Sequence, residues 1–176
     1  MKAELVAKIR TVPNWPKNGI MFRDITTLLK DKEGFRHMLD LFCERYRHMD
    51  IDIVAGVESR GFIIGAAVAD RLGKGFIPIR KAGKLPAKIV SAEYALEYGT
   101  DRIEMHHDAI VEGAKVLLVD DLIATGGTAL AACELIKELN GRVVECGFII
   151  NLKNLPGKEK LERMGYKVAS LLDMEG

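Results

Sequence analysis

The sequence lacks the features that mark several large classes of protein. Its three cysteines, Cys43, Cys133 and Cys146, lie far apart and form no Cys-x-x-Cys pair, which favours reduced thiols over a disulfide framework. No stretch approaches the roughly eighteen consecutive apolar residues of a membrane helix, and the charged start Met1–Glu4 lacks the apolar core of a signal peptide. We therefore expect a soluble cytoplasmic protein.

Charge asymmetry, internal repeats and the common phosphate motifs are also missing. The formal net charge is +1, which gives no electrostatic reason to expect a nucleic-acid partner. The chain contains no Gly-x-x-x-x-Gly-Lys-Ser/Thr and no Gly-x-Gly-x-x-Gly after a strand, so P-loop and dinucleotide-binding interpretations have no support. With 48% hydrophobic and 29% charged residues and no linker, we expect one domain over residues 1–176.

The hydrophobic pattern predicts strands that alternate with helices. Strands are expected at 51–57, 75–80, 88–96, 116–119 and 143–152 and near Val168, and helices at 5–9, 35–46, 62–72, 128–140 and 158–164. Asp31 is a candidate helix cap, and Gly73 and Gly141 are candidate helix ends. Short connections between alternating strands and helices are typical of an α/β fold with a mainly parallel sheet.

Two segments do not fit a regular element. Pro13–Gly19 contains prolines and a glycine and predicts an ordered loop that Trp15 pins in place. Residues 97–112 form a long polar connection with few core residues, and such a connection in a small domain is usually functional or disordered. His106 and His107 in this stretch lack metal-ligand spacing, so we expect both side chains to lie in water.

The most informative segment is the run from Val116 to Thr128. Four apolar residues at 116–119 predict a strand that is buried on both faces, and Asp120 and Asp121 follow at its carboxyl end. A loop of small residues at 124–128 then opens a helix, where glycines and free N–H groups favour a bound phosphate. Paired carboxylates beside a phosphate cradle indicate a phosphorylated sugar whose hydroxyls the acids hold.

This run resembles the phosphoribosyl-pyrophosphate signature of the type I phosphoribosyltransferases. Asn18–Thr26, Arg80–Pro86 and Leu96–Gly99 are further similar to the purine-salvage branch that acts on adenine, so the resemblance spans nearly the whole chain. It implies that the mainly parallel sheet carries a small hood, built partly from residues 1–34, and that 97–112 is a mobile active-site loop. The implied reaction transfers 5-phosphoribose from phosphoribosyl pyrophosphate to adenine, giving AMP and pyrophosphate.

The resemblance also implies a role for individual residues. Those for the ribose and its 5′-phosphate are Asp120, Asp121, Ala124, Thr125, Gly126, Gly127 and Thr128. Those for pyrophosphate are Glu58, Ser59, Arg60, Arg80, Lys81 and Lys84, and those for the purine base are Met21, Phe22, Arg23 and Leu152. Glu97 would act as a catalytic residue beside the two aspartates by moving a proton between purine nitrogens, and Tyr98 would help to seal the loop. Mg²⁺ is expected on the diphosphate rather than in a protein cage, and the enzyme is expected to be a homodimer.

The implied chemistry explains why these residue types are needed. Breaking the bond from C1′ to pyrophosphate develops positive charge on the ribose and negative charge on the leaving group, so cations and N–H donors must face the diphosphate. Glu58–Gly61 follows a strand and precedes a helix at the same sheet edge as Asp120, and a cis peptide bond often occurs there in the family. Two alternatives stay open: an enzyme for hypoxanthine, guanine or xanthine, and a non-catalytic regulator of the same fold.

Overall fold

The centre of the fold is a seven-stranded sheet. The computed structural model describes residues 2–96 and 99–176. The strands of the sheet are β3 (Ile53–Val57), β4 (Gly75–Lys81), β5 (Ile89–Ala95), β6 (Thr100–His106), β7 (Lys115–Ile123), β8 (Arg142–Leu152) and β9 (Val168–Met174). Their order is β5-β6-β4-β3-β7-β8-β9, and all neighbours from β4 to β9 are parallel, whereas β6 is antiparallel to both β4 and β5. The mainly parallel α/β sheet that the sequence predicts is therefore confirmed.

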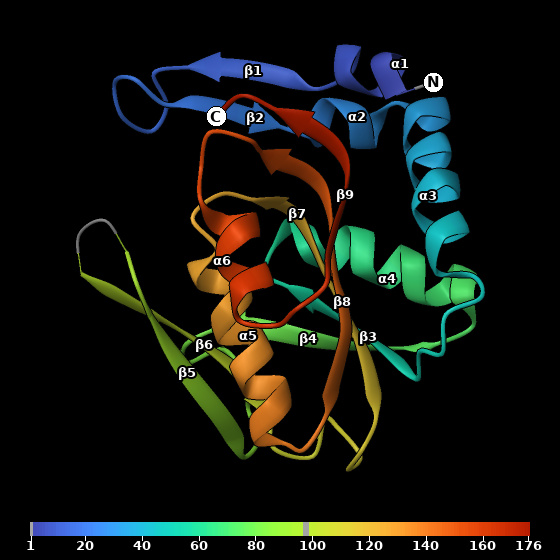
Figure 1. Ribbon diagram of the computed structural model, residues 1–176, viewed down its shortest axis with the longest axis vertical. Coiled ribbons are helices and arrows are strands. Elements are labelled where there is room, and N and C mark those ends of the chain that lie inside the picture. Colours follow the sequence, from blue (N-terminus) through green and yellow to red (C-terminus); the bar gives the residue numbers. More distant parts are fainter. Residues whose placement is uncertain (1, 97–98) are drawn as a thin grey trace.

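Helices cover both faces of this sheet (Figure 1). The helices α3 (Lys32–Tyr46) and α4 (Arg60–Leu72) pack on one face, and α5 (Gly127–Glu138) and α6 (Gly157–Arg163) pack on the other. Side chains alternate along a strand, so neighbouring residues of β7 face opposite sides of the sheet. Leu117 and Val119 pack in the core under α3 and α4, whereas Val116 and Leu118 pack in the core under α5 and α6. All four side chains are fully buried, which explains the unbroken apolar run at the centre of the sheet.

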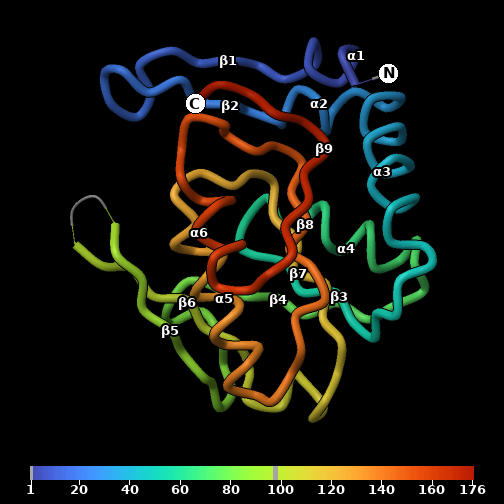
Figure 2. The backbone as a smooth tube through the Cα atoms, viewed as in Figure 1, coloured from blue at the N-terminus to red at the C-terminus, as the bar shows by residue number. Residues whose placement is uncertain are grey.

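The N-terminal segment forms a separate layer across one end of the sheet (Figures 1 and 2). It consists of α1 (Lys2–Ala7), α2 (Thr26–Lys30) and an antiparallel hairpin of β1 (Arg10–Pro13) with β2 (Met21–Asp24). The Arg23 guanidinium donates two hydrogen bonds, 2.6 and 2.9 Å long, to the carbonyl oxygen of Glu175. These bonds hold the hairpin against the chain just after β9, at the carboxyl edge of the parallel strands.

The connection between β1 and β2 is ordered by local contacts. The Trp15–Pro16 peptide bond is cis, and the Asn14 side chain accepts a hydrogen bond of 2.9 Å from the Gly19 amide. The Trp15 ring stands edge-on to the Phe22 ring, with 4.5 Å between the ring centroids. The loop and the role of Trp15 agree with the sequence analysis, but the two short strands on either side were not predicted.

Helix ends follow local signals, with one difference. Asp31 caps α3 by accepting a hydrogen bond of 2.6 Å from the Gly34 amide, and α4 ends where Gly73 takes a left-handed φ of 65°. The helix α5 ends at Glu138 and not at residue 140, since Asn140 rather than Gly141 has the left-handed φ, 58°.

The expectation of a structureless connection over residues 97–112 is wrong for its centre. Residues 100–106 form β6, which pairs along its whole length with β5. Ile103 and Met105 are buried in the core, and Glu104 between them is buried as well. Polar and apolar residues alternate from Arg102 to His106, which is the pattern of a strand, and the interpretation of the whole stretch as a polar connection overlooked it.

Candidate active site

A cavity of about 420 Å³ opens at the carboxyl ends of β3 and β7. Residues 57–60 and 120–129 line it, together with Lys81, Tyr94 and Ile103. Ligands of open α/β sheets bind at this edge. The fold thus brings the predicted diphosphate turn and the predicted ribose-phosphate run together around one cavity.

Asp120 and Asp121 have different surroundings because β7 continues through both of them. Asp121 is 4% exposed and accepts a short, charge-assisted hydrogen bond from Arg60 Nε. The Oδ1 atom of Asp120 accepts a hydrogen bond of 2.8 Å from the Asp121 amide. Burial, and next the charge of Asp121, raise the pKa of Asp120 well above its ordinary value. One acid is therefore paired with a cation, whereas the other is desolvated beside a like charge.

A close approach of α4 to β7 brings Arg60 to the acids. A Cβ atom on Gly61 would lie 2.8 Å from Asp120 Oδ1 and 3.0 Å from the Val119 carbonyl oxygen, so this position has no room for a side chain. The peptide bond between Glu58 and Ser59 in the preceding turn is cis. The turn that the sequence predicted for a diphosphate has therefore the isomer that the family resemblance suggested.

The loop between β7 and α5 presents backbone N–H groups to the cavity. Gly126 has a φ of 81° and begins the helix without a side-chain cap. The first-turn N–H groups of a helix have no carbonyl partner in that helix, and together with the helix dipole they favour an anion.

A glycine far along the chain supports this loop. The Gly157 amide donates a hydrogen bond of 2.9 Å to the Ala124 carbonyl oxygen. A Cβ atom on Gly157 would lie 2.3 Å from that oxygen and 2.7 Å from the Gly126 nitrogen. The shape of the loop depends on this packing, which no pattern in the sequence indicated.

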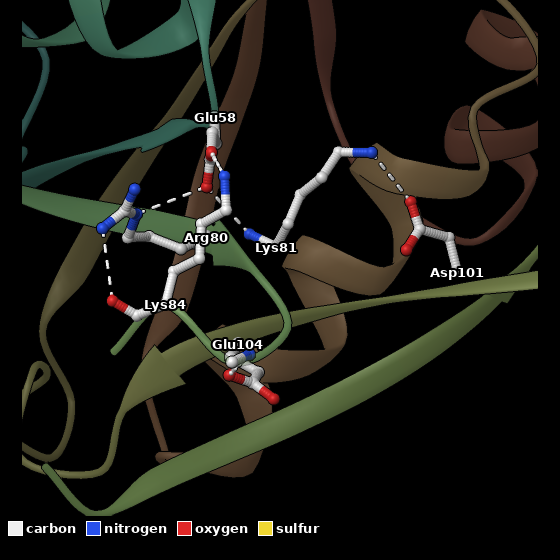
Figure 3. Close-up of polar contacts among 7 residues, drawn as sticks. Glu58, Arg80, Lys81, Lys84, Asp101 and Glu104 are labelled. Atoms are coloured by element: carbon white, nitrogen blue, oxygen red, sulfur yellow. Dashed lines mark hydrogen bonds and ion pairs between the residues drawn. The ribbon is translucent and has the colours of Figure 1, made fainter. Parts of the chain in front are cut away.

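The basic turn Arg80–Lys84 begins with the last two residues of β4, and its cations bind two different acids (Figure 3). Glu58 accepts hydrogen bonds from Lys84 Nζ at 2.8 Å, the Lys81 amide at 3.0 Å and Arg80 Nε at 3.3 Å. Burial by itself would raise the pKa of Glu58, but these bonds, that from Lys84 foremost, lower it. Arg80 and Lys84 do not line the cavity. Of the three cations predicted for pyrophosphate in this turn, the structure thus brings only Lys81 to it.

Lys81 extends away from Glu58 toward the β5–β6 hairpin. Its ammonium donates a hydrogen bond of 2.9 Å to Asp101 Oδ2, as Figure 3 shows. The Tyr94 hydroxyl donates to the same oxygen at 3.0 Å, and Tyr94 lines the cavity together with Thr128. Sequence reasoning missed Tyr94 and Asp101. The alternation within 88–96 placed Tyr94 on a strand without a role, and Asp101 lay in the stretch interpreted as a loop.

The hairpin β1–β2 reaches this cavity through Arg60. The Arg60 guanidinium carbon lies 5.5 Å from the centroid of the Phe22 ring, a cation–π distance, while Arg60 also binds Asp121. Arg60 therefore connects the aromatic ring predicted for the base with the acid predicted for the ribose.

None of the residues predicted for the base, Phe22 included, belongs to the cavity lining. Met21 is 37% exposed on β2, whereas Leu152 is 8% exposed at the end of β8. The Arg23 guanidinium is bound within the chain, to the Thr11 hydroxyl and the Glu175 carbonyl oxygen.

Three further predictions have different outcomes. Glu97 and Tyr98 lie outside the described residues. His106 does not lie in water, because its Nε2 atom is buried and has no hydrogen-bond partner among the described residues, whereas His107 is exposed. All three cysteines are free and buried, and the Sγ atom of Cys146 lies 3.5 Å from that of Cys133.

Neither a cluster of metal ligands nor a membrane-spanning helix is found in the described part of the chain. Residues 2–96 and 99–176 contain no group of three or more histidine, cysteine or acidic side chains placed to bind a metal ion. No helix in these ranges combines the length and apolar character needed to cross a membrane.

Comparisons with known proteins agree with the geometry. A family model of the phosphoribosyl transferase domain matches residues 24–173. The adenine phosphoribosyltransferase of Chlorobium luteolum is 59% identical over 172 residues, which are 97% of each chain. A crystal structure of this enzyme from Thermoanaerobacter pseudethanolicus has a TM-score of 0.95 and 45% identity and covers 99% of this chain and 100% of that one. The structure of the Saccharomyces cerevisiae enzyme, in complex with adenine and an imino-altritol bisphosphate, has a TM-score of 0.90 and 39% sequence identity. The match covers 97% of this chain and 98% of that one. The chain belongs to the phosphoribosyltransferase family, and within it to the adenine phosphoribosyltransferases.

Proposed function

We propose that this protein is a purine-salvage enzyme that transfers 5-phosphoribose from phosphoribosyl pyrophosphate to adenine, giving AMP and pyrophosphate. The observation that carries the proposal is the cavity in which paired acids, an open helix N-terminus and two cations meet. The similarity to enzymes named adenine phosphoribosyltransferase over almost the whole chain supports the choice of base. A relative solved with adenine bound supports it further.

The ribose and its phosphate fit the loop that follows β7. We assign the 5′-phosphate to the backbone N–H groups of residues 124–128, with the hydroxyls of Thr125 and Thr128 as further donors. Carboxylates are hydrogen-bond acceptors, so Asp120 and Asp121 are suited to the ribose hydroxyls. Both acids also lie where positive charge develops on the ring as the bond to pyrophosphate breaks, and they stabilise that charge.

The diphosphate fits the opposite wall of the cavity. The backbone of the Glu58–Ser59 turn and the first residue of α4, Arg60, face it from one side, and Lys81 faces it from the end of β4. The described residues offer no cage of three metal ligands. We expect a magnesium ion to arrive as part of the substrate complex, with diphosphate and water oxygens as its principal ligands, where it would neutralise charge on the leaving group.

The base fits between the hairpin and the cavity. Phe22 offers an aromatic face for stacking, and Leu152 offers an apolar contact at the end of β8. Adenine needs an acceptor for its 6-amino group and a donor for N1, and we assign these to the backbone at Met21 and Arg23. A 6-oxopurine presents the reverse pattern, so it would leave polar groups unpaired.

The proton transfer is assigned to Glu97. A glutamate that approaches the purine can move a proton between its nitrogens as the N-glycosidic bond forms, and Tyr98 would shield that step from water. We expect Glu97→Gln to lower kcat more than it weakens the binding of phosphoribosyl pyrophosphate. Equal single-turnover rates in the variant and the wild type would contradict this role.

A purine panel tests the proposal as a whole. Purified protein is given phosphoribosyl pyrophosphate, Mg²⁺ and one purine, and nucleotide formation is followed for adenine, hypoxanthine, guanine and xanthine. We expect adenine to exceed each 6-oxopurine in kcat/KM by a factor of about 10⁴. Efficient use of hypoxanthine would overturn the choice of base, whereas no nucleotide from any purine would overturn the enzyme assignment. Light scattering of the same sample tests the expected homodimer, and cell fractionation tests the expected cytoplasmic location.

A further inference from the structure

Lys81 differs from the other cations of its turn in the partner that it has. Arg80 and Lys84 both bind Glu58, and neither lines the cavity. Lys81 lines the cavity, but its ammonium binds Asp101 at 2.9 Å (Figure 3). The side chains of Lys81 and Asp101 are 54% and 27% exposed, so this pair is neither dry nor rigidly packed. A pair of this kind contributes little to stability and can exchange partners.

Asp101 is held in place by groups other than Lys81. Its Oδ2 atom accepts from the Tyr94 hydroxyl at 3.0 Å, and its Oδ1 atom accepts from the Arg102 amide at 2.8 Å. The hydrogen bond from Lys81, followed by that from the Arg102 amide, lowers the pKa of Asp101, so the carboxyl is charged at neutral pH. If the ammonium leaves, each carboxylate oxygen keeps one hydrogen bond. Asp101 can therefore release Lys81 without becoming an unsatisfied buried charge.

A diphosphate in the cavity and Asp101 need the same ammonium. The diphosphate carries several negative charges, and Arg60 is the other cation of the lining, itself bound to Asp121. Asp101 also carries the same sign of charge as the ligand and sits on the lysine that the ligand would bind, so the two repel each other. Both effects reduce the affinity for a diphosphate, whether it is the substrate's or the free product.

We propose that Asp101 is a positioning residue that holds the Lys81 ammonium until a diphosphate takes it, and that retakes it as pyrophosphate leaves. This inference rests on the proposed function, since it assigns the diphosphate to this wall of the cavity. Asp101 thus weakens diphosphate binding and speeds the release of pyrophosphate. Tyr94 keeps the carboxylate within reach of Lys81 throughout, and it lines the cavity beside the loop that we assign to the 5′-phosphate.

The test is Asp101→Asn with inorganic pyrophosphate and Mg²⁺ as the probe. Calorimetry should show pyrophosphate binding about three- to tenfold more tightly than to the wild type, because the competitor and the repelling charge are both gone. The KM for phosphoribosyl pyrophosphate should fall in parallel, and the dissociation rate of pyrophosphate should fall by a similar factor. A purely structural role for Asp101 would instead raise that KM and lower the melting temperature.

The matched control is Glu93→Gln, which removes the same charge from an exposed residue of β5 that does not line the cavity. It should leave pyrophosphate binding within about twofold of the wild type. In a Lys81→Ala background, Asp101→Asn should have a smaller effect, since no ammonium remains to be shared. Unchanged or weaker pyrophosphate binding in a folded Asp101→Asn variant of an active enzyme would overturn the inference alone. A wild type that binds neither pyrophosphate nor phosphoribosyl pyrophosphate would overturn the proposed function as well.

Discussion

Replacing either acid of the pair with asparagine should remove most activity but change stability in opposite directions. Burial and the charge of Asp121 raise the pKa of Asp120 in the folded protein. A folded-state pKa above the unfolded value means that the folded protein binds more protons between these two values, so the free energy of unfolding falls as pH rises through that interval. At neutral pH the Asp120 charge therefore destabilises the fold, and Asp120→Asn should raise the melting temperature.

Asp121→Asn should lower the melting temperature. The substitution leaves Arg60 without its ion-pair partner, and breaking a fully buried pair costs about 3–5 kcal/mol. Because 33% of the Arg60 side chain is exposed, solvent screens part of this cost, and we expect about 2 kcal/mol. For a chain of this length, that loss corresponds to a fall of about 4–8 °C.

Both variants should lose catalytic efficiency by similar factors. Each substitution removes a charge-assisted hydrogen bond to the ribose, worth about 1.5–3 kcal/mol, so kcat/KM should fall by about 10- to 150-fold. The assays are AMP formation at varied phosphoribosyl pyrophosphate and thermal unfolding at about pH 7.5 and about pH 5, where the gain from Asp120→Asn should shrink. Equal losses of stability in the two variants, or wild-type kcat/KM in Asp120→Asn, would refute the reasoning.

Two further predictions concern residues outside the cavity lining. Gly157→Ala should raise the KM for phosphoribosyl pyrophosphate by about tenfold or more. The new methyl group would lie 2.3 Å from the Ala124 carbonyl oxygen and would displace it, and with it the phosphate loop. Initial rates at varied substrate concentration measure this KM, and an unchanged value would contradict the prediction. Arg45→Ala should lower the free energy of unfolding, measured in urea, by about 2–3 kcal/mol while kcat of the folded protein stays constant. The reason is that Glu145 is 2% exposed and, among the described residues, would keep only the Tyr46 hydroxyl as a side-chain partner.

The parts of the site that the sequence predicted are those with a contiguous signal. In Val116–Thr128 a buried strand, two acids and a glycine loop follow one another, so neighbours in sequence remain neighbours in the cavity. Glu58–Gly61 was placed beside them by a general property of parallel sheets, namely that the carboxyl ends of neighbouring strands meet at one edge. The fold class followed from the same alternation of strands and helices.

The parts that could not be predicted depend on contacts between distant segments. The buried carboxylate of Glu104 has two partners, the Arg102 guanidinium at 3.1 Å and the Gly83 amide at 2.9 Å. The pattern of polar and apolar residues cannot show such partners. The short hairpin strands β1 and β2 contain charged residues that find partners only in the fold, such as Arg10 with Asp24. The division of the cations of the basic turn between Glu58 and Asp101 likewise needs the sheet order, because it depends on β6 lying beside β4.

The contact between Trp15 and Phe22 has a practical consequence. Trp15 is the chain's one tryptophan, and its ring stands 4.5 Å from the aromatic ring that we assign to the base. Its side chain is about half exposed, so its emission will respond to a change in local polarity. Intrinsic fluorescence of the unlabelled wild-type protein should therefore report the arrival of a purine at the hairpin. Filling of the phosphate loop, on the far side of Arg60, should leave that signal largely unchanged, so the order in which the two substrates bind can be followed optically in real time.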